Sequence, residues 1–463
     1  MTNSNIFVRF APSPTGLLHI GNIRAILFNY LFARKHGGRF LLRIDDTDQE
    51  RSRDEYEQAI RRDLTWLGYK WDEEARQSSR MDRYMAVIEE LKSKGRVYPC
   101  FETQAELDLK RKTQLGRGLP PVYDRAALKL TPAEIQAKLD KGESPHWRFK
   151  LLDGEITWED GIQGAKKFPA SSMSDPVLIR EDGVPLYSIC SVIDDADMGI
   201  THVVRGEDHV TNTATQIQMW QAVTDKPVPQ FAHFPLLVSL DGTEMSKRLG
   251  TLSIGSMRDD DKIEPMAINS LIARLGTSDP ITPCLDMNEL AAGFDFSKIS
   301  RATPKFDLNE LKQLSTKILR ITPYAQIKDR LGDEISEEFW NAVQPNINSL
   351  EDVDLWWKVT NGPVELVREE ETFLNQAADL LPAEPWDETT WQTWTDAVKE
   401  KTDRKGKALF MPLRLALTGT DHGPELKLLL PLMGRERVLR RLRGYPPPLK
   451  SPYTEYALTH SKR

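Results

Sequence analysis

The first fifty residues change their pattern of apolar positions twice. An apolar run rich in β-branched residues covers 6–10 and predicts a buried strand. Two prolines and a glycine within 12–16 then interrupt regular structure. The next apolar residues are spaced as on one face of a helix: Ile23, Ile26, Leu27, Tyr30 and Leu31. A glycine pair at 37–38 ends that helix, and a second apolar run at 40–44 completes a predicted strand–helix–strand unit.

Strand and helix patterns continue to alternate downstream. A helix follows the second strand, with Ser52 and Glu55 at capping-box spacing. Four further apolar runs predict strands, at 176–180, 186–189, 200–206 and 235–240. Residues 264–275 have helical spacing, and after Leu314 only helical periodicity remains. Six tryptophans of that last region are predicted to lie in its core: Trp340, Trp356, Trp357, Trp386, Trp391 and Trp394.

The stretch from 98 to 175 interrupts this alternation. Charged helical patterns at 104–113 and 132–141 flank turns rich in glycine and proline, and short strands follow at 147–151 and 156–160. The predicted fold class is therefore α/β. A Rossmann-like parallel-sheet domain is split by an α+β insertion and is followed by an all-helical C-terminal region.

Composition limits the classes of partner and compartment. The chain has 463 residues, 40% hydrophobic and 28% charged, as is usual for a soluble enzyme of about three domains. Its net charge of −7 means that a nucleic acid would have to meet local basic patches. Three scattered cysteines, Cys100, Cys190 and Cys284, favour a reducing compartment and predict neither a disulfide framework nor a zinc site. We find no signal segment and no apolar run of about 18 residues, so we expect a cytoplasmic protein without a membrane span.

The junction between the loop at 12–16 and the first helix carries the most distinctive chemistry. It reads His19-Ile20-Gly21-Asn22. A helix start presents free backbone N–H groups and the positive end of the helix dipole, and both favour a phosphate. The imidazole of His19 adds a donor, and Gly21 lets a ligand approach the backbone. An isolated motif of this kind is weak, but the strand–loop–helix context is the one that it requires.

Together with two flanking stretches, this junction resembles the catalytic opening of glutamyl-tRNA synthetases, which are class I aminoacyl-tRNA synthetases. The flanking stretches are FAPSPTG at 10–16 and RIDDTD at 43–48. The second signature of class I enzymes is matched by EMSKR at 244–248, where Glu244 replaces the usual first lysine and Lys247 carries the basic role. The resemblance covers nearly the whole chain and is stronger before Leu314 than after it.

The resemblance implies an order of domains. The catalytic nucleotide-binding fold would occupy 1–97 and 176–250, on either side of a connecting insertion at 98–175 that receives the tRNA acceptor end. A stem-contact domain would follow at 251–314, then a helical anticodon-binding region at 315–445 and a tail at 446–463.

The resemblance also implies two ligand sites, residue by residue. The ATP site would consist of Ser13, Thr15, Gly16, His19, Gly21, Asn22, Met245, Ser246 and Lys247, with His19 and Lys247 as the catalytic groups. The glutamate site would consist of Arg9, Ala11, Ser13, Asp45, Tyr187, Ser191, Arg205 and Asp208. Arginine suits the two carboxylates of glutamate, and we assign Arg9 and Arg205 to them jointly, with Arg205 preferred for the side chain. Asp45 would hold the α-ammonium group. Ser191 and Ala196 stand where many relatives have Asn and His.

The implied reaction is the ATP-dependent ligation of L-glutamate to a glutamate tRNA, a glutamine tRNA or both. It passes through glutamyl-adenylate and releases pyrophosphate and AMP, with Mg²⁺ accompanying ATP. The partners would be L-glutamate and tRNA, and the family suggests a monomer.

Basic residues supply the predicted tRNA contacts. Arg148 and Lys150 alternate with the apolar Trp147 and Phe149, and an ordinary half-buried strand is the alternative explanation. Near the C-terminus the predicted phosphate contacts are Lys407, Arg437, Arg440 and Arg441, for which a solvated basic face is the alternative.

Four other functions compete with this interpretation. A nucleotidylyltransferase or small-molecule ligase shares the first motif but seldom carries a long helical C-terminal region. A degenerate synthetase paralogue that only binds tRNA would fit Glu244 and Ser191, but not the intact His19, Gly21 and Lys247. Glutaminyl-tRNA synthetase has a β-rich C-terminal part, and a short tRNA-modifying relative lacks the anticodon-binding domain. No arginine that would reject the glutamine anticodon is found at 344–346.

Overall fold

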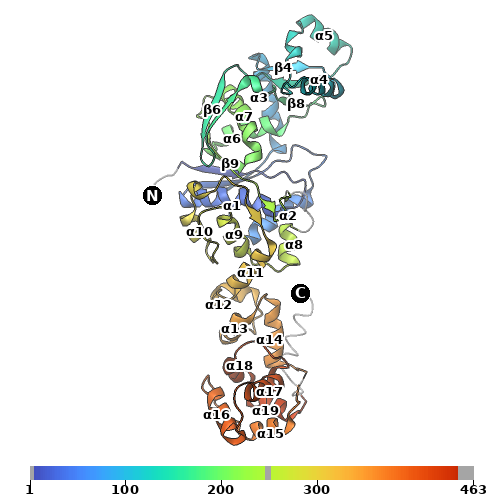
Figure 1. Ribbon diagram of the computed structural model, residues 1–463. Helices are drawn as coiled ribbons and strands as arrows, with labels where there is room; N and C mark the ends of the chain where they lie inside the picture. The colour runs from blue at the N-terminus through green and yellow to red at the C-terminus, as the bar shows by residue number, and fades with distance from the viewer. Residues whose placement is uncertain (1–4, 244, 246–251, 366, 447–463) are drawn as a thin grey trace. The chain divides into compact units, whose positions relative to one another are not determined.

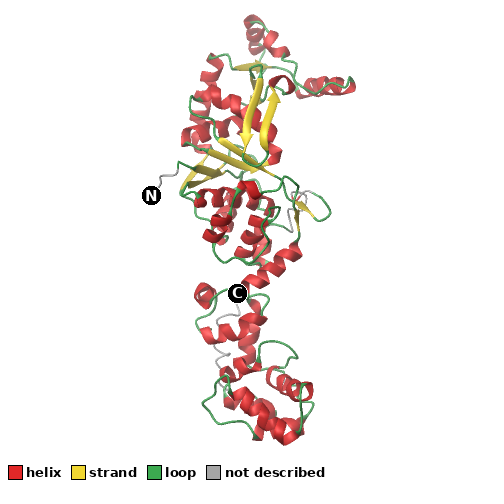
Figure 2. Ribbon diagram, turned by 60° about the vertical axis from the view of Figure 1, so that its left-hand side comes forward, coloured by secondary structure: helices red, strands yellow, loops and turns green. Residues whose placement is uncertain are grey.

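The computed structural model describes residues 5–243, 245, 252–365 and 367–446, which form two compact units. Unit 1 comprises Met1–Asp261 and Pro265–Leu311, and unit 2 comprises Lys262–Glu264 and Lys312–Arg463. Figure 1 labels their elements, and Figure 2 distinguishes helices from strands. No helix in these described ranges is long and apolar enough to cross a membrane.

Unit 1 begins with the predicted strand–helix–strand unit. Strands β1 (Phe7–Phe10) and β2 (Arg39–Ile44) pair in parallel with Phe7 opposite Arg39, and α1 (Ile20–Lys35) connects them. Strand β3 (Glu73–Arg76) extends this sheet in parallel beyond β2. The strands β1 and β2 are almost entirely buried, as expected of parallel strands covered on both faces.

A second sheet of unit 1 has the order β7-β6-β10-β9. Its strands are β6 (Glu155–Asp160), β7 (Gly164–Pro169), β9 (His202–Gly206) and β10 (Gln230–Phe234). Strand β10 is parallel to both β6 and β9, whereas β7 is antiparallel to β6. The backbone N–H of Thr201 donates to the carbonyl of Phe7 at 2.9 Å, so β9 begins beside β1. The parallel α/β class is thereby confirmed.

Two predicted strands are wrong. Residues 186–189 begin the helix α6 (Tyr187–Met198), because the apolar positions that continue to Ala196 follow helical spacing once the window is longer than four residues. The run at 235–240 contains only the two-residue strand β11 (Val238–Ser239), which pairs with β12 (Lys305–Phe306). The central strand is instead β10, just before it.

The other helices of unit 1 include α2 (Asp54–Trp66), α3 (Met81–Ser93), α7 (Val210–Val223), α8 (Ile254–Asp259), α9 (Pro265–Arg274) and α10 (Met287–Gly293). Helices α9 and α10 pack against α1, and α8 packs against α2. The capping box predicted at Ser52 is wrong. Arg53 is the N-cap of α2 and makes no side-chain capping bond. The three acidic residues of the first turn favour the helix dipole instead.

The predicted insertion and its flanks form a three-stranded sheet of β4 (Val97–Cys100), β5 (His146–Phe149) and β8 (Val177–Ile179), in the order β4-β5-β8. The strand predicted at 176–180 to resume the catalytic sheet is β8, which pairs antiparallel with β5 instead. Its helices α4 (Gln104–Gly116) and α5 (Pro132–Asp140) each begin with a Thr–Glu capping box. The two strands predicted within the insertion belong to different sheets. Strand β5 lies in the antiparallel sheet, whereas β6 joins the sheet of β9 and β10.

Unit 2 contains only helices as regular elements among its described residues. They are the C-terminal part of α11 (Leu308–Leu319), α12 (Tyr324–Ile327), α13 (Glu337–Val343), α14 (Glu351–Asn361), α15 (Glu371–Asp379), α16 (Thr390–Thr402), α17 (Lys407–Thr418), α18 (Leu426–Met433) and α19 (Arg435–Arg443), with short 3₁₀ turns. The six tryptophans pack in or against one apolar core, and Trp340 and Trp394 are fully buried there. The helical C-terminal region is confirmed.

Candidate active site

A cavity of about 850 Å³ lies where four strands of unit 1 end. Its wall includes Arg9 from β1, Arg43 from β2, Arg205 from β9 and Phe234 from β10, together with the first residues of α1. In open α/β sheets, ligands bind at the carboxyl ends of the strands. The volume is that of a cofactor or nucleotide site.

His19 is the N-cap of α1 and is held in one orientation. Its Nδ1 accepts a hydrogen bond from the backbone N–H of Gly21 at 3.1 Å, and the side-chain oxygen of Asn22 accepts one from the backbone of His19. Burial lowers the pKa of His19, so the ring is neutral near pH 7. Because Nδ1 accepts, the ring proton lies on Nε2, which leaves a neutral N–H donor at the helix start.

Glycine is needed at position 21 for a structural reason that the sequence did not reveal. A β-carbon at this position would lie 2.9 Å from Cε1 and 3.0 Å from Nδ1 of His19. The residue must therefore be glycine for the imidazole to occupy its place. This requirement stands beside the predicted close approach of a ligand to the backbone.

Only Met245 of the second signature is described. It lies in the cavity wall and is buried, whereas Glu244, Ser246, Lys247 and Arg248 lie outside the described residues. After this gap the chain returns beside the first signature, because Ser253 forms a β-bridge with His19. The backbone N–H of Ile254 also donates to the carbonyl of Leu18 at 2.9 Å. Met245 therefore lines the cavity, and the chain after the gap lies beside His19, which lines it too.

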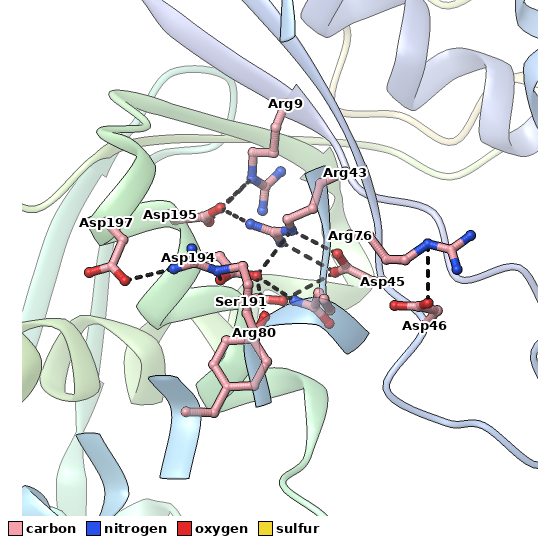
Figure 3. Close-up of polar contacts among 12 residues, drawn as sticks. Arg9, Arg43, Asp45, Asp46, Arg76, Arg80, Ser191, Asp194, Asp195 and Asp197 are labelled. Carbon is pink, nitrogen blue, oxygen red and sulfur yellow. Dashed lines mark hydrogen bonds and ion pairs between the residues drawn. The ribbon is translucent and has the colours of Figure 1, made fainter. Parts of the chain in front are cut away.

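Below the cavity lies a buried network of arginines and aspartates, shown in Figure 3. The fully buried Arg43 donates from Nε to Asp45 at 2.7 Å and from Nη1 to Asp195 at 2.7 Å. Asp194 is also fully buried and accepts from Arg80 Nε and from the hydroxyl of Tyr84. Buried charges are tolerated when they are paired and hydrogen-bonded in this way.

Asp45, predicted to hold the substrate's ammonium group, is already engaged within the protein. Both of its oxygens accept from Arg43, and the hydroxyl of Ser191 lies 3.4 Å from Oδ2. Burial raises the pKa of Asp45, against the opposing effect of Arg43. The carboxylate still lines the cavity, so its remaining lone pairs can accept from an ammonium group.

The two predicted carboxylate-binding arginines lie in the same cavity but have different partners. Arg9 donates from Nε to both oxygens of Asp195 at 3.2 Å. Arg205 instead donates to the neutral acceptors Thr213 and Gln216, at 2.6 and 2.7 Å. Burial, and then the charge of Arg9, lower the pKa of Arg205 to about 10, so it remains a cation at neutral pH.

The cavity also takes in most of the other predicted ligand residues, namely Ala11, Ser13, Asn22, Tyr187, Ser191 and Asp208. Thr15 and Gly16 are not part of the wall formed by the described residues, and the backbone of Thr15 instead donates to the carbonyl of Ser13 in a turn. Tyr187 is half-exposed, and its hydroxyl accepts from Asn212. Ala196 is buried in the apolar core behind the cavity.

Sequence reasoning missed the residues that hold the predicted ones in place. Arg43 was named only as the first residue of the RIDDTD stretch and was given no role in the site, although it stands two residues before Asp45. Asp195 and His233 carry no local motif at all. An acidic pair within an apolar helix pattern, as at 194–195, is the sequence signal for such partners, because buried carboxylates require cationic partners.

Two of the predicted tRNA contacts require correction. Arg148 is buried, donates to the carbonyl of Asp175 at 2.7 Å and stacks over the ring of Tyr123. Arg441 is buried and donates to the carbonyls of Leu417 and Gly362. Both guanidinium groups are buried and donate to carbonyl groups within their own unit, so neither is the exposed phosphate contact that the sequence predicted.

The other four basic residues differ in their accessibility. Arg437 is partly buried and donates to the carbonyl of Met433 at 2.8 Å. Arg440 pairs with Glu436, one helical turn earlier, at 3.1 Å. Lys150 is partly exposed and Lys407 is exposed. Lys150, Lys407 and Arg440 therefore remain the better predictions for phosphate contacts.

Cys100 lies in a hydrogen-bonded cluster of the insertion. Its Sγ is 3.1 Å from a carboxylate oxygen of Glu102 and 3.5 Å from the hydroxyl of Tyr123. Burial raises the pKa of this thiol. Within the described ranges, no three His, Cys, Asp or Glu side chains are grouped as a metal site.

Comparison with known proteins agrees with this geometry. The model of the catalytic domain of class I tRNA synthetases (E and Q) matches residues 5–313, and that of an anticodon binding domain matches residues 322–445. A glutamate–tRNA ligase of Azospirillum brasilense is 54% identical, over 95% of this chain and 99% of that protein. One of Maricaulis maris is 52% identical, over 94% of this chain and 99% of the relative.

A solved structure is also similar. It is a glutamate tRNA ligase from Elizabethkingia meningosepticum in complex with its amino acid, with a TM-score of 0.81 and 26% identity, covering 95% of this chain and 99% of the other. The matched families span both units of the chain. The chain therefore belongs to the class I tRNA synthetases, and among them to the glutamate–tRNA ligases.

Proposed function

We propose how the residues of this cavity carry out the ATP-dependent ligation of L-glutamate to tRNA. The observation that carries the proposal is the meeting of two guanidinium groups with a helix start in one cavity. Arg9 and Arg205 come from different sheets, and α1 begins at the same wall with its Nε2–H donor on His19. Glutamate offers two carboxylates to the arginines, and ATP offers phosphates to the helix start.

The amino acid is bound before it is activated. The Nη atoms of Arg9 make no hydrogen bond with any described residue and are available for one carboxylate. Arg205 meets the other, which we take to be the side-chain carboxylate. Asp45 and Ser191 face the ammonium group. The side chain of Asp45 is short, so a water can mediate its contact with that group.

Activation transfers the adenylyl group. An oxygen of the glutamate α-carboxylate attacks the α-phosphorus of ATP, the bond to the β-phosphate oxygen breaks, and pyrophosphate leaves. The protein holds the reactants in line and stabilises the charge that develops. His19 donates to a phosphate oxygen, and Lys247 is assigned the same task from the second signature. Mg²⁺ enters with the phosphates of ATP, and we assign it no protein ligand.

The second step moves the glutamyl group. A hydroxyl of the terminal adenosine of tRNA attacks the carbonyl carbon of the adenylate, and AMP leaves. The insertion is proposed to receive the acceptor end, and the helical region of unit 2 the anticodon arm. We further propose a cytoplasmic monomer, for which light scattering would give a mass near the 52.8 kDa of the chain.

The test is pyrophosphate exchange measured with glutamate, ATP and tRNA. We expect His19→Ala and Lys247→Ala each to lower exchange about 100-fold or more, with unchanged melting temperatures. Near-normal exchange in both variants would refute the assignment of the site. Exchange supported by glutamine rather than glutamate would favour glutaminyl chemistry, and charging of purified glutamate and glutamine tRNAs would show which tRNA is used.

A further inference from the structure

The guanidinium of Arg205 is held from behind by three side chains that carry no negative charge. Its Nη2 donates to Thr213 Oγ1 at 2.6 Å and to Gln216 Oε1 at 2.7 Å, both from α7. Its Nε faces Nε2 of His233, from β10, at 3.4 Å. Arg9, in the same cavity, is held differently, by the carboxylate of Asp195.

The fully buried His233 can perform this role in only one tautomer. Arginine nitrogens only donate, so Nε2 of His233 must accept and the ring proton must lie on Nδ1. The hydroxyl of Thr213 lies 2.9 Å from Nε2 and can donate a hydrogen bond to the same lone pair. Burial also lowers the pKa of His233, which keeps the ring neutral.

Asp160, at the end of β6, selects that tautomer. Its Oδ2 accepts from Nδ1 of His233, while its Oδ1 accepts from the backbone N–H groups of Ile162, Gln163 and His233 at 2.9 to 3.1 Å. Burial by itself would raise the pKa of Asp160, but these hydrogen bonds outweigh it and lower the pKa to about 2. Asp160 is therefore an ionised acceptor with a fixed orientation.

The consequence concerns charge. Arg9 is paired directly with Asp195, so its positive charge is largely compensated before any substrate arrives. Arg205 forms no ion pair with a carboxylate of the described residues, and the charges of Asp195 and Asp208 act on it only over longer distances. Three neutral side chains therefore hold Arg205, and no direct salt bridge competes with a ligand for its guanidinium.

We propose that Asp160 and His233 are positioning residues for Arg205, and that together with Thr213 and Gln216 they hold its guanidinium while leaving its charge uncompensated for a carboxylate of the substrate. The proposal rests on the proposed function, since it assigns Arg205 to the amino acid. It separates two tasks that one carboxylate would combine, namely orienting the arginine and neutralising it.

Asp160→Asn tests the tautomer. Three backbone N–H groups surround Oδ1, so the amide oxygen takes that place and the amide NH₂ faces Nδ1 of His233. The ring proton then moves to Nε2, where it opposes the N–H groups of Arg205. We expect the KM for glutamate in pyrophosphate exchange to rise about tenfold, as for a lost hydrogen bond to a charged group, with the KM for ATP changed less than about twofold.

Gln216→Glu tests the charge. It places a carboxylate at the 2.7 Å contact with Nη2, so Arg205 stays held but is neutralised. We again expect a rise of about tenfold in the KM for glutamate. Gln221→Glu is the matched control, because it adds the same charge at an exposed position of the same helix. It should leave both KM values within about twofold. An unchanged KM for glutamate in Gln216→Glu would overturn the proposal that the charge of Arg205 is left uncompensated.

The imidazole can also be observed directly by ¹⁵N NMR, with His233→Gln to assign its signals. We expect the proton on Nδ1 in the unaltered protein and on Nε2 in Asp160→Asn. A proton on Nε2 in the unaltered protein, or equal rises in both KM values in Asp160→Asn, would overturn the proposal. If Asp160→Asn does not fold, the KM values for glutamate and for ATP are compared in Thr213→Val and Gln216→Glu instead. Absence of any glutamate-dependent exchange in the unaltered protein would instead reject the proposed function, while the tautomer would still be readable.

Discussion

Arg43 joins Asp45 to Asp195: one guanidinium, fully buried, lies 2.7 Å from a carboxylate oxygen of each. Through Asp195 it is also linked to Arg9, whose Nη atoms face no other described acceptor. The two predicted glutamate ligands Arg9 and Asp45 are therefore connected through an arginine that was not predicted. A change at Arg43 should disturb the position of both.

Arg43→Met should be strongly destabilising. It removes the cation that Asp45 and Asp195 share, so the buried Asp45 loses its salt bridge and Asp195 keeps only Arg9. Removing one partner of a buried ion pair costs about 3–5 kcal/mol. The free energy of unfolding from urea titration of the whole chain is the measurement. Arg39→Met is the control, because Arg39 lies on the same strand and pairs with Glu73 at the surface. Its loss should cost about 1 kcal/mol or less, and equal losses in the two variants would contradict the network.

Gly21→Ala should remove activity without unfolding the protein. The new methyl group would lie within 3.0 Å of the ring of His19 and displace it. We expect kcat/KM in pyrophosphate exchange to fall about 100-fold, as for the loss of a charge-stabilising donor. Gly255→Ala in α8 is the matched control, since the nearest atom that its β-carbon would meet is Nη2 of Arg258, 3.8 Å away. Wild-type activity in Gly21→Ala would show that His19 need not keep its capping position.

The stability of the protein should fall as the pH is lowered through about 6.5. Burial is the largest cause of a lowered pKa at five histidines of unit 1, namely His19, His146, His202, His209 and His233. The unfolded chain then binds more protons than the native protein between the lowered native pKa values and the ordinary value near 6.5. Stability is therefore retained above pH 6.5 and lost progressively below it.

Urea titrations at pH 7.5, 6.5 and 5.5 measure this dependence. His233→Gln should reduce its slope, because one of the groups responsible has been removed. A free energy of unfolding that stays constant or rises toward pH 5.5 would contradict the assignment of neutral buried rings.

Arg440 and Arg441 should respond differently to substitution although they are neighbours. Arg441→Met leaves the buried carbonyls of Leu417 and Gly362 without a donor, which should cost about 1–3 kcal/mol of stability. Arg440→Ala removes a partly exposed side chain paired with Glu436 and should change stability by less than about 0.5 kcal/mol. Its effect should appear in the KM for tRNA and in a weaker salt dependence of that KM. The opposite pattern would place Arg441 at the tRNA surface.

The parts of the fold that followed from sequence are those with long, regular patterns. The unit of β1, α1 and β2 was predictable because both strands are continuous apolar runs and the helix has a complete apolar face. Residues 186–189 were misread because four apolar positions cannot distinguish a strand from the first turn of a helix. The partition of β5 and β6 between two sheets depends on pairing with β8 and β10, about thirty and seventy residues farther along the chain.

The candidate site divides in the same way. That His19, Arg9 and Arg205 line one cavity was predictable, because they lie in motifs or at the ends of strands. The residues that orient them were not found, because Asp160 and His233 are 73 positions apart and meet only through the pairing of β6 with β10. Arg148 and Arg441 were misassigned because a basic residue in sequence gives no sign of whether buried carbonyls use up its donors.

The hydrogen bond from Thr201 to Phe7 marks the boundary between two sheets that a bound amino acid would span. It is one of the contacts that join the sheet of β1 to the sheet of β9, and the two arginines proposed to bind glutamate lie on these two strands. A ligand bound by both arginines would link the two sheets. Substrate binding would then raise the free energy of unfolding of the catalytic domain, before any bond in ATP is broken.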